Sequence, residues 1–266
     1  MHDLSVDSSA QPPRRVGVLL LPGFSLLAQA CALEPLAVAS QLAGRRLYAP
    51  VAFGLDARAV TSAAEMTLSP PLVLGDDDRE LDLLLVCAPS PLAATLPASL
   101  AQWLKRLAGR GVILGGIAGG AEVLAWAGVL DGYRATLPWQ RVDAVGQEHP
   151  AINLSPQLFE IDRDRLTCGG GTSAMDMVMT LIGMHHGQRL AEKVSEHFVC
   201  ERIRMADEPQ HVPLRSRLGH APQSLIDAVA LMEANIEEPL TTAWQRRIAF
   251  AFLFPPRASG PTMHGI

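Results

Sequence analysis

A glycine-rich turn between an apolar strand and a helix constrains the fold of this chain more than any other segment. The run Val112-Ile113-Leu114 has the continuous hydrophobicity of a buried strand, and Gly115-Gly116-Ile117-Ala118-Gly119-Gly120 follows it. Helix-like sequence begins at Ala121. Glycines let the backbone turn sharply, so that one side chain projects over the end of a sheet. The pattern therefore predicts a nucleophile elbow, the strand, turn and helix that present a catalytic side chain.

The predicted elbow carries a methyl group where the nucleophile would stand. Ala118 occupies this position, and alanine can neither attack a carbonyl nor be activated by a base. We predict the scaffold of an amidase-like enzyme without its chemistry. The amides of Gly119 and Gly120 open the next helix, where they can hold a carboxylate or another small anion. The alternative is that these glycines only permit close packing between strand and helix.

Strands and helices alternate along the first half of the sequence. Continuous apolar runs predict strands, and longer amphipathic stretches between them predict helices. This alternation indicates an α/β fold, namely a doubly wound, flavodoxin-like, mostly parallel sheet with helices on both faces. The predicted strands are 16–21, 51–54, 81–87 and 111–116, and the predicted helices are 26–43 and 96–110.

A hairpin and two more helices are predicted after this region. Leu158 to Ile161 and Arg165 to Cys168 flank the polar turn Asp162-Arg163-Asp164. Ser173 and Asp176 have the spacing of a capping box for a helix through Met184. A further helix is expected over 189–203, followed by a segment rich in proline and charge.

Composition excludes several classes of protein. The chain has 266 residues, 48% of them hydrophobic, and a formal net charge of −5. Nucleic-acid-binding domains are usually basic, so the charge argues against such a surface over the bulk of the chain, while a small basic module is compatible with it. No apolar run approaches the roughly 18 residues of a membrane span. The four cysteines are widely spaced, as expected of buried thiols in a reducing compartment. We therefore expect a soluble cytoplasmic protein with no membrane partner and no cofactor.

The domain organisation follows from changes in composition. We predict a disordered lead over residues 1–15, an α/β domain over 16–205, a linker over 206–221 and a short helical segment over 222–266. The apolar helices from Ala174 to Ile203, which contain Met175, Met177, Met179 and Met184, are candidates for a homodimer interface. Packing of the same residues in the core is the alternative.

Several motifs together resemble one known family. The chain resembles the GlxA-type regulators of the AraC family, which join a PfpI-like, class I amidotransferase-like domain to a helix-turn-helix DNA-binding domain. Within this family, it is most similar to members that sense small amino acids or betaine-like compounds. The matching stretches are 19–24 (LLLPGF), 33–36 (LEPL), 161–168 (IDRDRLTC), 175–177 (MDM), 201–204 (ERIR), 213–215 (PLR) and 230–240 (ALMEANIEEPL).

Departures from the family pattern argue against catalysis. Besides Ala118 at the nucleophile position, Ala28 stands where many relatives have Asp, and Leu137-Pro138-Trp139 lacks the His that commonly precedes the tryptophan. None of these residues can titrate. The resemblance thus implies a ligand-sensing, non-catalytic regulator domain. The alternative function is an amidase- or hydratase-like enzyme with an unusual nucleophile such as Cys87 or Cys168.

The candidate ligand-binding residues lie in loops at the carboxyl ends of the predicted strands and beside them, where sites form in such sheets. Trp139 could hold a quaternary ammonium group on its indole face or be an ordinary core residue. Glu34 could be a charge partner for the ligand or a structural residue. The predicted ligand-binding set is Phe24, Glu34, Ala118, Gly119, Gly120, Trp139, Gly170 and Thr172.

The C-terminal sequence departs from the family a second time. Two helix-turn-helix units need roughly 100 residues, whereas the match ends at Leu240 and proline interrupts the sequence at Pro255 and Pro256. This pattern predicts an incomplete DNA-binding part, through a frameshift or premature end. DNA is the partner that the resemblance implies, and the incomplete pattern argues against autonomous sequence-specific binding.

The histidines do not predict a metal site. His185, His186 and His197 lack the spacing that would bring three ligands together, and they lie near no carboxylate cluster. Histidines at the surface or at helix ends are the expected interpretation.

Overall fold

The computed structural model describes residues 12–92, 95–210, 225, 227 and 229. The chain divides into two compact units, residues 1–210 and 211–266. Residues 1–11 of the predicted lead and residues 211–221 of the predicted linker lie outside the described residues. Of the predicted C-terminal segment 222–266, only residues 225, 227 and 229 are described. The first unit contains all the helices and strands discussed below.

The first unit is a seven-stranded, mostly parallel sheet between two layers of helices. The strand order is β10-β11-β7-β6-β1-β2-β5, and β10 alone in this sheet runs antiparallel to its neighbour. This confirms the predicted doubly wound α/β fold. The main-sheet strands are β1 (Arg14–Leu20), β2 (Tyr48–Gly54), β5 (Leu72–Val73), β6 (Leu83–Ala88), β7 (Ile113–Ala118), β10 (Phe159–Asp162) and β11 (Arg165–Cys168).

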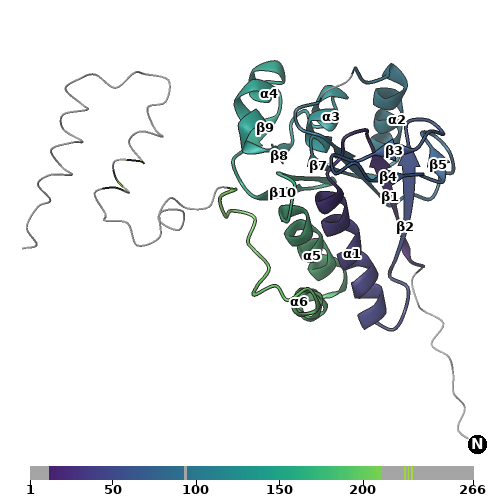
Figure 1. Cartoon of the computed structure of the whole chain (residues 1–266), viewed down its shortest axis with the longest axis vertical. Helices are drawn as coiled ribbons and strands as arrows, with labels where there is room; N and C mark the ends of the chain where they lie inside the picture. Colours follow the sequence, from purple (N-terminus) through teal and green to yellow (C-terminus); the bar gives the residue numbers. More distant parts are fainter. Residues whose placement is uncertain (1–11, 93–94, 211–224, 226, 228, 230–266) are drawn as a thin grey trace, which may run out of the picture. The chain divides into compact units, whose positions relative to one another are not determined.

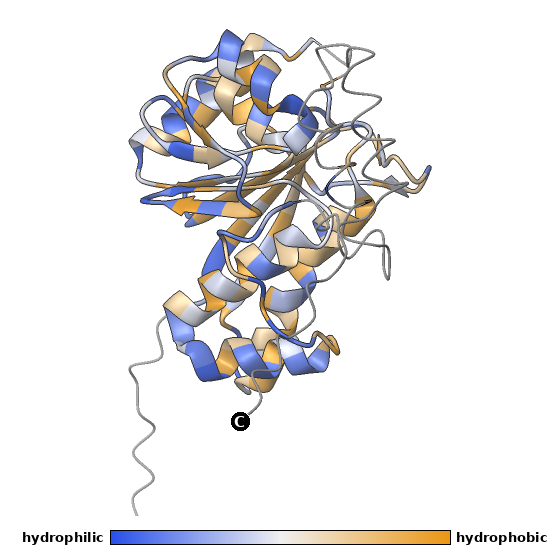
Figure 2. Ribbon diagram, turned by 90° about the vertical axis from the view of Figure 1, so that its left-hand side faces the viewer, coloured by the Kyte–Doolittle hydropathy of each residue, from blue (hydrophilic) through white to orange (hydrophobic). Residues whose placement is uncertain are grey.

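Helices cover both faces of the sheet, as Figure 1 shows. One apolar core lies between the sheet and α1, α5 and α6, and a second lies between the sheet and α2 and α3. The central strands are strongly hydrophobic along their length (Figure 2), because both of their faces are buried. The helices are α1 (Leu26–Leu42), α2 (Ala98–Gly109), α3 (Gly120–Trp126), α4 (Val142–Glu148), α5 (Ser173–His186) and α6 (Gln188–His197).

The first unit also contains two short two-stranded sheets and a 3-10 helix outside the main sheet. The 3-10 helix and the β8–β9 pair lie between α3 and β10 in the sequence, and the β3–β4 hairpin lies between β2 and β5. The elements are β3 (Val60–Thr61), β4 (Thr67–Leu68), β8 (Arg134–Thr136), β9 (Asn153–Ser155) and the 3-10 helix η1 (Trp139–Arg141). No described helix is long and apolar enough to cross a membrane.

Several element boundaries differ from the sequence-based expectations. Arg14 and Arg15, assigned above to the disordered lead, are the first residues of β1. Residues 206–210, assigned to the linker, belong to the first unit. The last predicted helix ends at His197 rather than at Ile203.

The predicted capping box at the start of α5 is absent. Thr172 is the N-cap residue, and it makes no capping hydrogen bond through its side chain. The hydroxyl of Ser173 instead donates to the carbonyl oxygen of Gly170 at 2.6 Å, while Asp176 accepts hydrogen bonds from Arg204. The Asp176 carboxylate, which the sequence pattern predicted to cap the helix, therefore pairs with Arg204 instead.

The methionines of α5 have different environments. Met177 and Met179 are completely buried in the core, so the packing alternative holds for them, whereas the Met184 residue is 66% exposed. Helix α5 packs against α1 and α6. The homodimer remains a prediction.

The end of α5 gives an expected pH dependence of stability. The Tyr48 hydroxyl lies 3.1 Å from Nδ1 of His185, and burial lowers the pKa of His185 to about 4, with smaller contributions from Arg14 and His186. The unfolded chain, with a histidine pKa near 6.5, binds this proton more readily. We therefore expect this site to lower the free energy of unfolding as pH falls from about 6.5 to about 4.

Denaturant titrations at several pH values measure this effect. Because carboxylates also respond to acid, the informative quantity is the difference between the wild type and His185→Gln. The variant should lose less stability between pH 7 and pH 4.5 than the wild type does. Parallel losses in the two proteins would show that His185 is not responsible.

Candidate functional site

The elbow is present, but its turn is shorter than the sequence suggested. Strand β7 continues through Gly115 and Gly116 to Ala118, so these two glycines lie in the sheet. Ala118 then has φ of +53°, a left-handed conformation that is unfavourable for alanine. The chain thus keeps the backbone shape of a nucleophile elbow and presents only a methyl group there.

The glycines after Ala118 are required by packing against the neighbouring strand. A Cβ atom at Gly119 would lie 1.7 Å from the carbonyl oxygen of Pro89, and one at Gly120 would lie 1.8 Å from that of Val86. The amide of Gly119 donates a hydrogen bond to the carbonyl oxygen of Ala88 at 3.2 Å, so it is engaged within the protein. This supports the packing alternative for Gly119 and leaves no structural argument for an anion at that amide.

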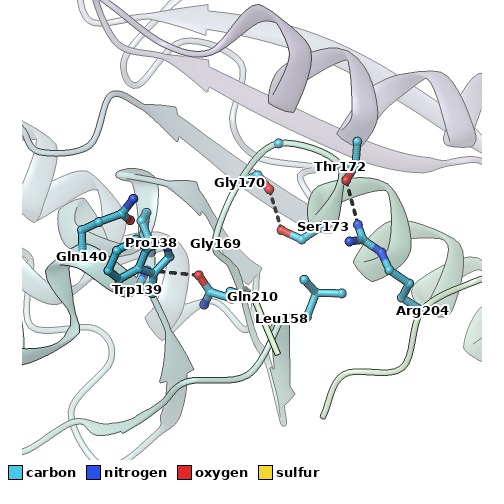
Figure 3. Close-up of a pocket in the computed structure, with 11 residues that line it drawn as sticks. Pro138, Trp139, Gln140, Leu158, Gly169, Gly170, Thr172, Ser173, Arg204 and Gln210 are labelled. Atoms are coloured by element: carbon cyan, nitrogen blue, oxygen red, sulfur yellow. Dashed lines mark hydrogen bonds between the residues drawn. The ribbon is translucent and has the colours of Figure 1, made fainter. Parts of the chain in front are cut away.

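A cavity of about 330 Å³ lies beside the elbow, between the loop after β11, η1 and the segment after α6. Of the predicted ligand-binding residues, Trp139, Gly170 and Thr172 line it. Figure 3 shows its walls, with η1 on one side and Arg204 on the other. The other lining residues, which the sequence analysis did not select, are Pro138, Gln140, Leu158, Gly169, Gly171, Ser173, Arg204 and Gln210.

The remaining predicted site residues do not line this cavity. Phe24 is completely buried in the core on the α1 side of the sheet, and Glu34 is exposed on α1. Ala118 lies just behind the cavity wall: a Cβ atom at Gly170 would be 2.7 Å from the Ala118 Cβ. The candidate site is therefore displaced from the elbow toward η1 and the loop after β11.

A partly exposed arginine, paired with a buried carboxylate, lies at the edge of the cavity. Arg204 donates from Nε and from one terminal nitrogen to Asp176, at 2.9 and 2.6 Å, and from that same terminal nitrogen to the Thr172 hydroxyl at 2.7 Å. Asp176 is only 4% exposed, so the pair is fixed on the carboxylate side. The guanidinium plane is consequently held in one orientation at the edge of the cavity, where it can meet a ligand carboxylate.

The tryptophan at the opposite wall is held by its neighbours in η1. Trp139 is 49% exposed, and its backbone amide donates to Oε1 of Gln210 at 3.1 Å. Two residues further on, Arg141 donates to the buried carboxylate of Glu122 at 3.0 to 3.1 Å. The Ser90 hydroxyl donates to the same carboxylate at 2.7 Å. Helix α3 and the loop after β6 therefore fix the position of η1, which carries Trp139.

The buried thiols are poor nucleophiles. Cys87 is 2% exposed and Cys168 is fully buried. Burial raises the pKa of the Cys87 thiol well above its usual range. Burial also raises the pKa of Cys168 to about 11, although the amides of Gly170 and Ala118 favour its thiolate. Neither thiol is accessible or ionised near neutral pH, which argues against the enzyme alternative.

Metal ligands are not gathered anywhere in the described part of the chain. No group of three His, Cys, Asp or Glu side chains among those residues is arranged to hold a metal ion. His185 instead contacts Tyr48, and His197 packs edge-to-face on Phe198.

The chain has the flavodoxin-like α/β fold of the DJ-1 and PfpI proteins. A ThiJ/PfpI family protein from Pseudomonas syringae superimposes with a TM-score of 0.61 at 20% identity, covering 93% of this chain and 95% of that one. An AraC family transcriptional regulator from Pseudomonas putida superimposes with a TM-score of 0.66 at 31% identity, covering 70% of this chain and all of that one. No protein-family model matches the sequence.

Sequence relatives give the family. The HTH-type transcriptional regulator GlxA of Rhizobium meliloti is 31% identical over 249 residues, which are 92% of this chain and 76% of that protein. The regulator GbdR of Pseudomonas aeruginosa is 39% identical over 228 residues, 86% of this chain, and the match spans 62% of GbdR. The chain belongs to the GlxA-type regulators of the AraC family, as the sequence motifs predicted.

Proposed function

We propose that residues 12–210 form the ligand-sensing part of a transcriptional regulator and perform no catalysis. One observation carries the proposal: the elbow backbone is intact, with φ of +53° at Ala118, but the side chain at its apex is a methyl group. The buried thiols nearby offer no substitute. Membership of a family of transcriptional regulators supports the same conclusion.

We infer that the ligand is a small metabolite of the amino-acid or betaine type. The cavity of about 330 Å³ suits a small molecule and combines an arginine with an exposed indole. The guanidinium of Arg204 can bind a carboxylate, and the face of Trp139 can attract an ammonium group by a cation–π interaction. A zwitterion carries both groups, so it can bind Arg204 through its carboxylate and Trp139 through its ammonium group.

Replacing Trp139 with alanine should reduce the ligand's effect on thermal stability. Millimolar glycine betaine should raise the Tm of the wild type, because a ligand that binds only the folded state stabilises it. Trp139→Ala should lose at least 0.5 to 1 kcal/mol of binding free energy, the range expected for an exposed cation–π contact. Differential scanning fluorimetry of the full chain measures both effects.

Three controls make this experiment specific. Trp126→Ala changes another exposed tryptophan, on α3 and outside the cavity, and should keep the response. Choline lacks the carboxylate and acetate lacks the ammonium group, so each should stabilise the wild type less than betaine does. Equal responses to betaine in both tryptophan variants would contradict the assigned role of Trp139.

Sequence-specific DNA binding by the whole protein is the activity that the family implies. The chain spans 62% of the length of GbdR, and its residues 230–266 lie outside the described part. We therefore propose this activity for the whole regulator. Gel-shift measurements with the full chain and promoter DNA would test it.

A further inference from the structure

The segment Arg204–Gln210, named here the strap, forms one wall of the ligand cavity and is the last part of the first unit. Arg204 and Gln210 at its two ends both line the cavity. The next residue, 211, begins the second unit. The strap is thus a direct covalent connection between the ligand site and the rest of the chain.

Gln210 fastens the end of the strap. Its Oε1 accepts the backbone N–H of Trp139 at 3.1 Å. Its Nε2 lies 2.8 to 2.9 Å from three acceptors, the Thr136 hydroxyl and the carbonyl oxygens of Leu137 and Gln157. Figure 3 shows the Gln210 side chain beside Trp139, between η1 and Leu158. One carboxamide therefore links the strap to the 3-10 helix that carries the candidate ligand contact.

The middle of the strap is tied to the unit by backbone contacts and by Ala206, which packs partly buried against the core. The amide of Leu158 donates to the carbonyl oxygen of Ala206 at 3.0 Å, and Gln157 and Pro209 form a single β-bridge. Met205 is 66% exposed. With few buried apolar groups, the hold on the strap depends mainly on the Arg204 and Gln210 contacts at its ends.

The glycine loop after β11 makes room for this contact. A Cβ atom at Gly169 would lie 2.6 Å from Oε1 of Gln210 and 2.8 Å from its Cδ. Gly169 does not have a positive φ, so the backbone does not require glycine there. The absence of a side chain at 169 is explained by the position of the Gln210 carboxamide.

From these contacts we propose that the strap is a ligand-sensitive latch, in which occupancy of the cavity and attachment of Gln210 reinforce each other. This rests on the proposed function of the same cavity. A ligand between Trp139 and Arg204 touches both the strap and the wall to which it is fastened. Because binding and latching are thermodynamically linked, detaching the strap must weaken binding by the same factor by which the ligand favours attachment.

Hydrogen exchange of the full chain, followed by mass spectrometry, tests the latch. In the ligand-free protein, Gln210→Ala should increase exchange of peptides covering 204–210 at least fivefold, without a change in β1 or α2. Gly169→Ala should do the same by displacing the Gln210 side chain. Gln147→Ala, which changes an exposed glutamine on α4, is the matched control and should have no effect on the strap.

The ligand arm uses glycine betaine at a concentration that saturates the Tm response of the wild type. Betaine should slow strap exchange in the wild type, and Gln210→Ala should bind betaine about tenfold more weakly. If betaine raises the Tm but leaves strap exchange unchanged, the latch is wrong and the sensor proposal stands. If betaine and free amino acids have no effect on Tm, the sensor proposal fails. The latch fails independently if strap exchange in ligand-free Gln210→Ala equals that of the wild type.

Discussion

Replacing Gly120 with alanine should destabilise the fold more than any other single substitution proposed for this protein. The added Cβ atom would lie 1.8 Å from the carbonyl oxygen of Val86, a backbone atom of the central strand β6. Neither the strand nor α3 can move away without breaking the core between them, and overpacking of this kind typically costs 1 to 3 kcal/mol or more. We expect a loss above about 3 kcal/mol because the clash is with the backbone. Urea denaturation, or recovery of soluble protein, measures the loss.

Gly109→Ala is the matched control for this substitution. Gly109 is the last residue of α2, and a Cβ atom there would meet nothing within 4 Å. Alanine favours a helix more than glycine does, so this variant should be unchanged or more stable by up to about 1 kcal/mol. A Gly120→Ala protein with wild-type stability would contradict the packing explanation of the elbow glycines.

Removing the Arg204 guanidinium should have the second-largest effect on stability. Arg204→Ala would leave the buried Asp176 carboxylate with only the backbone N–H of residue 204 as its remaining partner in this pair. Breaking a buried ion pair costs 3 to 5 kcal/mol, and partial exposure of this arginine reduces the expected loss to about 2 kcal/mol. Denaturant titration near neutral pH measures it.

Arg202→Ala provides a comparison on the same segment. Arg202 pairs with Glu208, but its side chain is 59% exposed, and exposed pairs contribute little. We expect a loss below about 1 kcal/mol. Equal losses for the two arginines would indicate that burial of Asp176 does not determine the cost. Arg204→Lys should recover part of the loss, since it restores the charge without the planar fork.

The layers of the fold were predictable because strands buried on both faces consist almost entirely of apolar residues, which are visible in the sequence. The runs ending in Leu20, Cys87 and Leu114 are continuous and apolar, and each lies in a central strand. The hairpin around Arg163 was also predicted, from the polar residues of its turn, and the structure contains it. Arg163 takes a left-handed conformation in this turn. These features depend on local sequence and on a period that burial imposes.

The candidate site was only partly predictable because its walls come from distant segments. Trp139, Gly170 and Thr172 follow strands or precede a helix, positions at which sites in such sheets are expected. Arg204 and Gln210 lie after the last helix of the unit and reach the cavity through tertiary contacts alone. The sequence signal for Arg204 is that its stretch 201–204 (ERIR) matches the family, although this match does not predict a place in the cavity.

The observed positions of Phe24, Glu34 and Asp176 also have a physical cause. A loop position at the end of a strand is compatible with either a pocket or the core, and Phe24 is in the core. Glu34 lies on a helix, where sequence alone could not distinguish a ligand-facing side chain from a solvent-facing one. Asp176 has the spacing of a capping residue, but the buried contact with Arg204 determines its orientation.

Isothermal titration calorimetry of the full chain with glycine betaine and with free amino acids tests the central claim most directly. The account predicts a saturable heat of 1:1 binding for at least one of these zwitterions, weakened in Trp139→Ala, with the baseline returning after each injection. Such a return means that the ligand is bound and left unchanged. An absence of saturable binding would contradict the account. A steady heat flow that persists after each injection would also contradict it, because it would indicate turnover.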